Sequence, residues 1–152
     1  SDVYKRQTHS TYAANPIGTR AGYEVMSIFD EERKELESEI ARKGAKFLDG
    51  LKALEKKYKN IGTVNGLGFA LSVEVTEADR FTPARELCDE IIEAGLKGDL
   101  TYKGKKCGLI LNNGGYFKNI ITLVPQLYIS DEEIDMALEL MDQLFDRYME
   151  KA

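Results

Sequence analysis

The strongest pattern in the sequence is a stripe of apolar residues at helical spacing. Successive members are three, four or seven residues apart, namely Leu36, Ile40, Phe47, Leu51, Leu54 and Tyr58. These intervals return to the same side of an α-helix, which completes a turn every 3.6 residues. Most of the intervening residues are charged or polar. The pattern therefore predicts a long amphipathic helix that buries one face.

A shorter helix is expected before this long one. Asn15-Pro16 marks a turn, and Pro16 suits the first turn of a helix that runs to about Phe29. Its apolar side consists of Ile17, Ala21, Val25 and Ile28. Asp30 and the two glutamates after it then predict a new helix start, because acidic groups stabilise the amino-terminal end of a helix dipole.

The hydrophobic period changes in the segment GTVNGLGFALSVEV. Apolar residues alternate there with smaller or polar ones, at Phe69, Leu71, Val73 and Val75. This alternation predicts one half-buried strand, whose beginning is loosened by Gly66 and Gly68. Thr82-Pro83 follows as an N-cap and first-turn proline for a helix that ends near Gly95.

The last third of the sequence predicts a hairpin and a final helix. The runs CGLILNN and NIITLVP are joined through Gly114, Gly115 and Tyr116, as in an antiparallel hairpin with a longer loop. Ser130 and Glu133 form a capping-box pair before an apolar helix face. We therefore predict an α+β fold, a small and mainly antiparallel sheet covered by helices on one face.

Composition and charge exclude several classes of function. With 43% hydrophobic and 31% charged residues, the chain suits a folded globular domain. A net charge of −5, with acidic and basic residues alternating, argues against nucleic-acid binding. No apolar run is long enough to span a membrane and no signal-peptide pattern occurs, so we expect a cytoplasmic origin and no membrane partner.

The residues that usually make metal sites or nucleophiles are few. The two cysteines, Cys88 and Cys107, match no metal-site spacing, and His9 is the one histidine. We therefore predict no metal site and no histidine-based triad, and we expect Cys88 to be a small buried hydrophobic residue. The glycine-rich pieces NGLG and NNGG match no complete phosphate-binding motif, which favours turns over phosphate loops.

Three blocks in order resemble the class III (ornithine/GABA-type) PLP-dependent aminotransferases. The segment THSTYAANPIG is similar to the family's H-x-x-T-x-x-x-N-P, with Thr8 where the family has histidine. IGTVNGLGFALSVEV resembles its G-x-V-R-G-x-G-L-x-x-G-x-E strand, and ITLVPQLYISDEEI resembles its R-L-x-P-P-L-x-I-T-x-E-E-I ending. The resemblance implies the carboxy-terminal small domain of a fold-type I PLP enzyme.

The resemblance also implies a cofactor contact and a missing group. Thr11 matches the threonine that donates a hydrogen bond to the PLP phosphate held mainly by the other subunit of the dimer. Taken by its local sequence alone, Thr11 is equally well a loop or capping residue. The family's catalytic lysine lies upstream, where this chain has only Lys5. The resemblance therefore implies that no residue of this chain is catalytic and that PLP belongs to the intact parent enzyme.

Two departures from the family pattern concern the substrate. Thr122 stands where many members have an arginine that clamps the substrate carboxylate, and Gln126 replaces the second proline. A threonine cannot replace a guanidinium group. Three explanations remain open. The parent enzyme handles an amine without a conventionally placed carboxylate, or another residue supplies the positive charge, or the position that matches the arginine lies a residue or two away. Asn65 replaces the arginine of the middle block, with no clear consequence.

These observations predict three segments and one main function. Residues 1–7 lack an apolar period and a cap, as in a non-native leader or a disordered native terminus. Residues 8–29 would be a linker and interdomain helix carrying Thr11, and 30–152 the small domain. We expect the parent to move an amino group from an amine or amino acid to a 2-oxo acid, and the chain alone to be inactive, without bound PLP.

The expected partners are the large domain of the same enzyme and a second copy of the chain. One rival hypothesis is a stand-alone ligand-binding or regulatory α+β module, with a small molecule bound at Gly114-Gly115. Another is a purely structural interaction domain. Bound PLP and transaminase turnover would separate the first function from both rivals.

Overall fold

The fold is taken from a computed structural model, which describes residues 15–152. Thr11, His9 and residues 1–7 lie outside the described residues. Contacts divide the chain into one unit that ends at Glu37 and a second from Ser38 to Ala152. The elements follow in the order α2 (Pro16–Lys57), β1 (Ile61–Leu67), β2 (Ala70–Val75), α3 (Arg85–Leu96), β3 (Leu100–Tyr102), β4 (Lys105–Cys107), β5 (Asn112–Gly114), β6 (Ile120–Leu123) and α4 (Asp131–Tyr148).

A single helix, α2, replaces the two helices expected between Pro16 and Tyr58. Its start is as predicted, because the Asn15 side chain accepts a hydrogen bond from the Ile17 amide at 3.0 Å. The predicted restart at Asp30 is wrong. Acidic residues favour a helix start, but they do not break a helix that already supplies partners for their amides. Neither glycine nor proline occurs near Asp30, so nothing local ends the helix there.

The segment predicted as one strand is a hairpin. β1 and β2 pair antiparallel from Ile61–Val75 to Leu67–Ala70, with an irregularity between Ile61 and Val64. Gly68 lies in the tight turn with φ of +56°, a left-handed conformation that glycine adopts without steric cost. The alternation beyond the turn is confirmed, because Phe69, Leu71, Val73 and Val75 are all buried. Gly68 therefore makes a turn and Gly66 lies within β1, where we expected only a loosened strand end.

β5 and β6 form the predicted antiparallel hairpin and complete a four-stranded sheet in the order β1-β2-β6-β5, but β5 covers only the end of the expected first strand and includes Gly114, which we expected in the connection. The register between β2 and β6 pairs Val73 with Ile121 and Ser72 with Thr122. Because side chains alternate along a strand, Val73 and Ile121 belong to one face and Ser72 and Thr122 to the other. The first face is buried, and we call the second, which carries Ser72 and Thr122, the outer face of the sheet.

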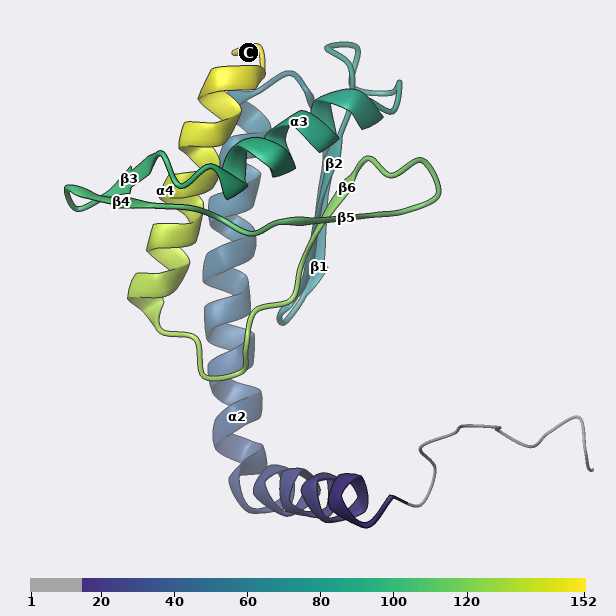
Figure 1. Ribbon diagram of the computed structural model, residues 1–152, viewed down its shortest axis with the longest axis vertical. Coiled ribbons are helices and arrows are strands. Elements are labelled where there is room, and N and C mark those ends of the chain that lie inside the picture. Colours follow the sequence, from purple (N-terminus) through teal and green to yellow (C-terminus); the bar gives the residue numbers. More distant parts are fainter. Residues whose placement is uncertain (1–14) are drawn as a thin grey trace, which may run out of the picture. The chain divides into compact units, whose positions relative to one another are not determined.

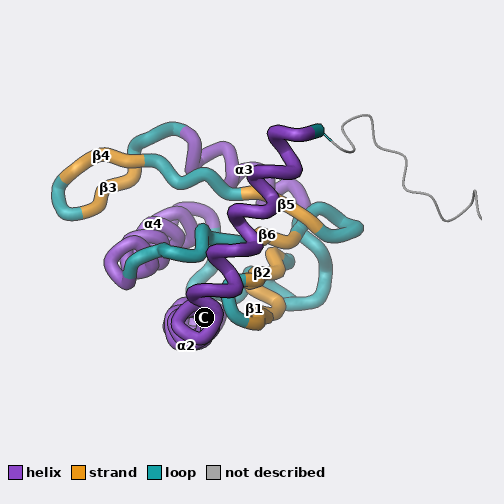
Figure 2. Tube along the Cα trace, turned by 90° about the horizontal axis from the view of Figure 1, so that it is seen from below, coloured by secondary structure: helices purple, strands orange, loops and turns teal. Residues whose placement is uncertain are grey.

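Helices cover the buried face, as predicted (Figures 1 and 2). In Figure 2 the strands follow one another from β1 to β5, with α4 and the second half of α2 on the same side. These two helices run parallel, since Lys46 of α2 pairs with Asp135 of α4, and Lys57, further along α2, pairs with Asp142, further along α4. Tyr58 adds a hydrogen bond of 2.7 Å from its hydroxyl to Asp142 Oδ1. One apolar core joins the sheet to the helices.

The ends of the last two helices test the capping predictions. Ser130 and Glu133 form the predicted capping box, in which Ser130 Oγ accepts from the Glu133 amide and Glu133 accepts from the Ser130 amide. The predicted Thr82 cap is wrong, because the residue before α3 is Ala84, which makes no side-chain cap. The Thr82 hydroxyl donates instead to Asp79 at 2.6 Å and helps to close the preceding loop.

A small two-stranded hairpin, β3–β4, was not expected from the sequence. It turns at Lys103 and Gly104, whose φ angles of +47° and +77° match the type I′ turn that suits strand twist. Gln143 of α4 holds the hairpin by accepting from the Thr101 amide at 3.0 Å and donating to the Thr101 carbonyl at 2.7 Å. The hairpin therefore lies against α4 and outside the main sheet.

Ion pairs between α2 and α4 predict an acid-sensitive contact. Hydrogen bonds from Arg42, and then from Lys46, lower the pKa of Asp131 from 3.8 to about 2. Because the folded value lies below the ordinary one, the pair stabilises the fold above pH 3.8 and this contribution is lost as the pH falls towards 2. At neutral pH we expect the urea midpoint of Asp131→Asn to be lower than that of wild type. At about pH 2 the two midpoints should lie closer together, because the wild type has then lost the ion pair as well.

Asp49→Asn is the matched control, since Asp49 is an exposed carboxylate of α2 without an ion pair among the described residues. This variant should keep the wild-type dependence of stability on pH. An unchanged gap between Asp131→Asn and wild type across the whole acid range would contradict the prediction.

Candidate functional site

Of the two residues assigned to the site from sequence, one is visible in the structure. Thr11 lies outside the described residues, so its proposed contact with a phosphate group stays a prediction. Thr122 lies near the middle of β6, on the outer face of the sheet, and its side chain is exposed. Its Oγ1 makes no hydrogen bond with another described residue.

Thr122 belongs to a row of polar residues that crosses all four strands. The register pairs Asn65 of β1 with Ser72 of β2, Ser72 with Thr122 of β6, and Thr122 with Asn112 of β5. Residues paired in this way share a face, so we call these four residues the polar row. All four side chains are uncharged hydrogen-bonding groups. Sequence reasoning placed Asn65 and Thr122 in separate blocks and did not predict that they line up.

A shallow hollow lies over one end of the polar row. Its volume is about 300 Å³, and we call it the sheet-face hollow. Its lining consists of Asn65, Gly66, Ala70, Leu71, Ser72, Thr122 and Val124. Val124, at 73% exposure, gives the hollow an apolar rim next to the hydroxyl of Thr122. The combination of two hydroxyls, an amide and aliphatic groups suits a ligand surface that is uncharged.

A second hollow meets the first one at Thr122 and Val124. It has a volume of about 370 Å³ and lies where the segments 109–112 and 123–125 approach the helices; we call it the sheet-end hollow. Its other lining residues are mostly apolar and include Phe47 of α2 and Met141 of α4. Among the described residues, no charged side chain lines either the sheet-face hollow or the sheet-end hollow.

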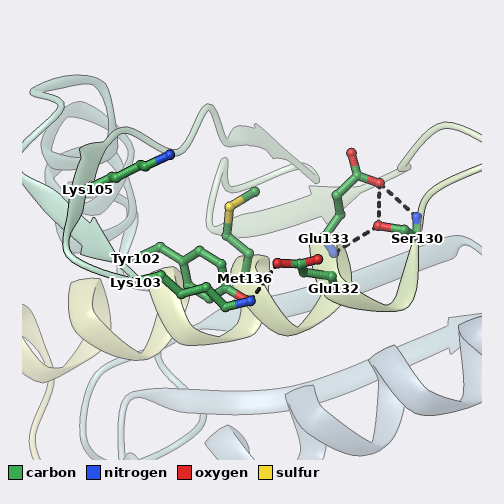
Figure 3. Close-up of a pocket in the computed structure, with 7 residues that line it drawn as sticks. All are labelled: Tyr102, Lys103, Lys105, Ser130, Glu132, Glu133 and Met136. Atoms are coloured by element: carbon green, nitrogen blue, oxygen red, sulfur yellow. Dashed lines mark hydrogen bonds and ion pairs between the residues drawn. The ribbon is translucent and has the colours of Figure 1, made fainter.

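A third hollow, of about 480 Å³, lies between the β3–β4 hairpin and the beginning of α4 (Figure 3). Its lining consists of Tyr102, Lys103, Lys105, Ser130, Glu132, Glu133 and Met136. Lys103 Nζ lies 2.6 Å from a carboxylate oxygen of Glu132, and Glu133 is occupied by the capping box with Ser130. Three of the four charged groups are therefore already engaged, Lys103 and Glu132 with each other and Glu133 with Ser130, so the hollow offers little to a ligand.

The titration of Lys103 also argues against a role as a nucleophile. The hydrogen bond to Glu132 raises the pKa of Lys103, which keeps its amine protonated. An amine that attacks a carbonyl group must be neutral, and enzymes lower its pKa for that purpose. Lys103 is therefore a partner in a surface ion pair.

The described residues do not make a complete site for PLP. The aldehyde of PLP takes a lysine amine, and its phosphate needs several oriented hydroxyl, amide or cationic donors. The polar row and the two hollows beside it offer only hydroxyl and amide groups. This donor set does not fit PLP by itself, and we derive no step of a reaction through that cofactor.

Other reactive groups in the described part of the chain are structural. Burial raises the pKa of the Cys88 thiol to about 11, so Cys88 is a small apolar residue of α3, as predicted.

From residue 15 onwards, no three cysteine, histidine or acidic side chains gather as a metal site would require. No helix in the same range is long and apolar enough to cross a bilayer.

Comparison with known proteins gives the chain a family. Residues 2–145 match the sequence pattern described as aminotransferase class-III. The chain is 34% identical, over 137 residues, to 4-aminobutyrate aminotransferase of Escherichia coli K12. The aligned region covers 90% of this chain and 30% of that enzyme. It is 32% identical to 5-aminovalerate aminotransferase of Pseudomonas putida KT2440, with 89% of this chain and 29% of that enzyme covered. The chain thus spans about 30% of the length of these curated relatives.

A solved structure supports the same assignment at the level of the fold. An aminotransferase from Bacillus anthracis superposes with a TM-score of 0.74 at 22% identity, covering 95% of this chain and 31% of that one. Its likeness concerns the small α+β domain with its antiparallel sheet. The match over residues 2–145, the two relatives and this shared fold agree, and the chain belongs to the class-III aminotransferase family.

Proposed function

We propose that this chain is the carboxy-terminal small domain of a PLP-dependent aminotransferase. The intact enzyme would lie in the cytoplasm and move an amino group from an amine or amino acid to a 2-oxo acid. When bound, PLP supplies the electron-withdrawing ring that makes this transfer possible. The observation that carries the proposal is the family match over residues 2–145, in a chain that spans about 30% of its relatives' length.

In this proposal the chain contributes no catalytic residue. Thr11 would donate a hydrogen bond to the PLP phosphate, and Thr122 would contact the substrate. The uncharged lining of the two hollows beside Thr122 supports the view that the lysine and the other charged groups of the site come from another part of the enzyme. The chain alone should therefore be inactive and should not retain PLP.

The exposed apolar residues of α2 support a further part of the proposal, that the chain packs against other protein. Six large apolar side chains between residues 17 and 29 are 39–81% exposed, namely Ile17, Tyr23, Val25, Met26, Ile28 and Phe29. Such a stretch is seldom left in water, because burying it releases about 25 cal/mol per Å². We propose that the large domain covers it in the intact enzyme and that the isolated chain self-associates through it.

The test compares the chain alone with the chain joined to a large domain. The second protein is a chimera in which the full chain replaces the aligned segment of the E. coli relative. Each protein is incubated with PLP, dialysed, and assayed with an amino donor and a 2-oxo acid. We expect the chimera to keep the absorbance of lysine-bound PLP and to turn over, and the chain alone to do neither.

Two results would overturn parts of this proposal. Stoichiometric PLP and turnover in the chain alone would show that it is not inert. A stable monomer that binds a metabolite without PLP, together with a chimera that keeps no PLP, would favour a stand-alone regulatory module. Analytical ultracentrifugation of the chain alone supplies the oligomeric state for this comparison.

A further inference from the structure

We infer that the wall formed by the polar row and the two hollows beside it binds an uncharged part of the amino donor and does not bind a carboxylate. This inference rests on the proposed function, because it assumes that the outer face at Thr122 meets the substrate. It goes further in naming the chemistry of the substrate group that this wall accepts.

The lining of the wall consists of uncharged residues. The sheet-face hollow and the sheet-end hollow share Thr122 and Val124, and within residues 15–152 none of their lining residues is charged. A carboxylate that leaves water needs a cation or several convergent donors to offset its desolvation. This wall would give it one free hydroxyl, from Thr122, and the amides of the polar row.

Two of the donor groups in the polar row are already used in hydrogen bonds within the sheet. Ser72 Oγ donates to the backbone carbonyl of Asn65 at 3.4 Å, and Asn65 Nδ2 lies 3.4 Å from Thr63 Oγ1. Two possible donors are thus turned towards neighbouring strand atoms and away from a shared ligand position. The row does not converge its donors as a carboxylate site does.

A negative charge lies on the same face of the sheet as the polar row. Glu74 lies on the outer face beside the polar row, and its carboxylate accepts from Thr63 Oγ1 at 3.1 Å. A negative charge here disfavours a second carboxylate on the same face. An aliphatic chain or another uncharged group instead gains by covering Ala70, Val124 and Leu67, which is 88% exposed.

The experiment measures donor preference in the chimera defined above. Two four-carbon donors are compared, 4-aminobutyrate, which ends in a carboxylate, and butylamine, which ends in a methyl group. The rate of the donor half-reaction gives kcat/KM for each donor without an acceptor. We expect the ratio of 4-aminobutyrate to butylamine kcat/KM to be lower in the chimera than in the intact E. coli enzyme, because the two proteins share the large domain and differ in the segment that this chain replaces.

Three variants identify the wall as the cause. Thr122→Arg should raise the ratio of 4-aminobutyrate to butylamine kcat/KM by about tenfold or more, the scale of one hydrogen bond to a charged group. Asn65→Arg adds the same charge to the sheet-face hollow from β1 and should raise the ratio in the same direction. Ala78→Arg adds it to an exposed position in the loop after β2 that lines neither hollow, and the ratio should stay within about twofold.

The outcomes separate this inference from the proposed function. A chimera that binds PLP and turns over, but whose ratio of 4-aminobutyrate to butylamine kcat/KM is no lower than that of the E. coli enzyme, overturns the inference alone. Equal shifts in Thr122→Arg and Ala78→Arg also overturn it, since a general change in the electrostatic field then explains the preference. A chimera that keeps no PLP overturns the proposed function, and the inference with it.

Discussion

Phe145→Ala should lower the free energy of unfolding by about 3–5 kcal/mol, the cost of removing a buried aromatic ring and leaving a cavity. Phe145 has no exposed surface, lies on the core side of α4 and meets the Tyr58 ring edge-to-face at 5.9 Å between centroids. Its loss would empty the contact between the second half of α2 and α4. Urea unfolding followed by circular dichroism measures the change.

Phe81→Ala is the matched control for this variant. Phe81 is 86% exposed in the loop between β2 and α3, so the same change of side chain should alter stability by no more than about 0.5 kcal/mol. Similar losses in the two variants would contradict the placement of Phe145 at the centre of the core. The slope of the unfolding curve should stay the same in both, which excludes a change in the surface exposed on unfolding.

Gly44→Ala should destabilise the fold by about 1–3 kcal/mol, as overpacking of a tight contact does. Gly44 of α2 touches the turn between β1 and β2, and a Cβ placed on it would lie 2.7 Å from the Gly68 carbonyl carbon and 2.8 Å from Gly68 Cα. These are backbone atoms of a turn that itself needs a left-handed residue. The helix or the hairpin must shift to make room.

Gly22→Ala separates this steric effect from helix propensity. Gly22 lies in the same helix, and among the described residues no atom beyond its chain neighbours and its own helix backbone lies within 4 Å of the Cβ that alanine would add. Alanine is about 0.5–1 kcal/mol better than glycine in a helix, so this variant should be slightly stabilising. Opposite signs for the two substitutions are expected in thermal and urea unfolding. A gain in stability for Gly44→Ala would show that the helix does not approach the turn so closely.

The local elements were largely predictable from the sequence, and the failures have local causes. The apolar period predicted the buried face of α2 from Phe47 to Tyr58 and of α4 from Ile134 to Phe145. The predicted break at Asp30 was wrong because residues that favour a helix start do not show whether that position already lies inside a helix. The β3–β4 hairpin could have been found from Lys103-Gly104 between Leu-Thr-Tyr and Lys-Lys-Cys, which is a weak pattern because each strand is only three residues long.

The site was predictable only in part. Thr122 was singled out because an arginine is expected at its position by resemblance, and its exposed place on β6 fits a role in binding. Ser72 and Asn112 were not proposed, although they flank Thr122 in the sheet. Neither residue belongs to a recognisable motif. Their common feature is register, which depends on how distant strands pair.

The sequence by itself determined the family, the amphipathic helices, the Ser130–Glu133 cap and the alternation of β2, because each depends on residues close together in the chain. The tertiary structure decided which residues meet: it aligned the polar row across four strands and brought Gly44 against Gly68. The physical reason is that strand register and helix–sheet packing depend on contacts between residues far apart in sequence, where one residue of slip turns every side chain to the other face.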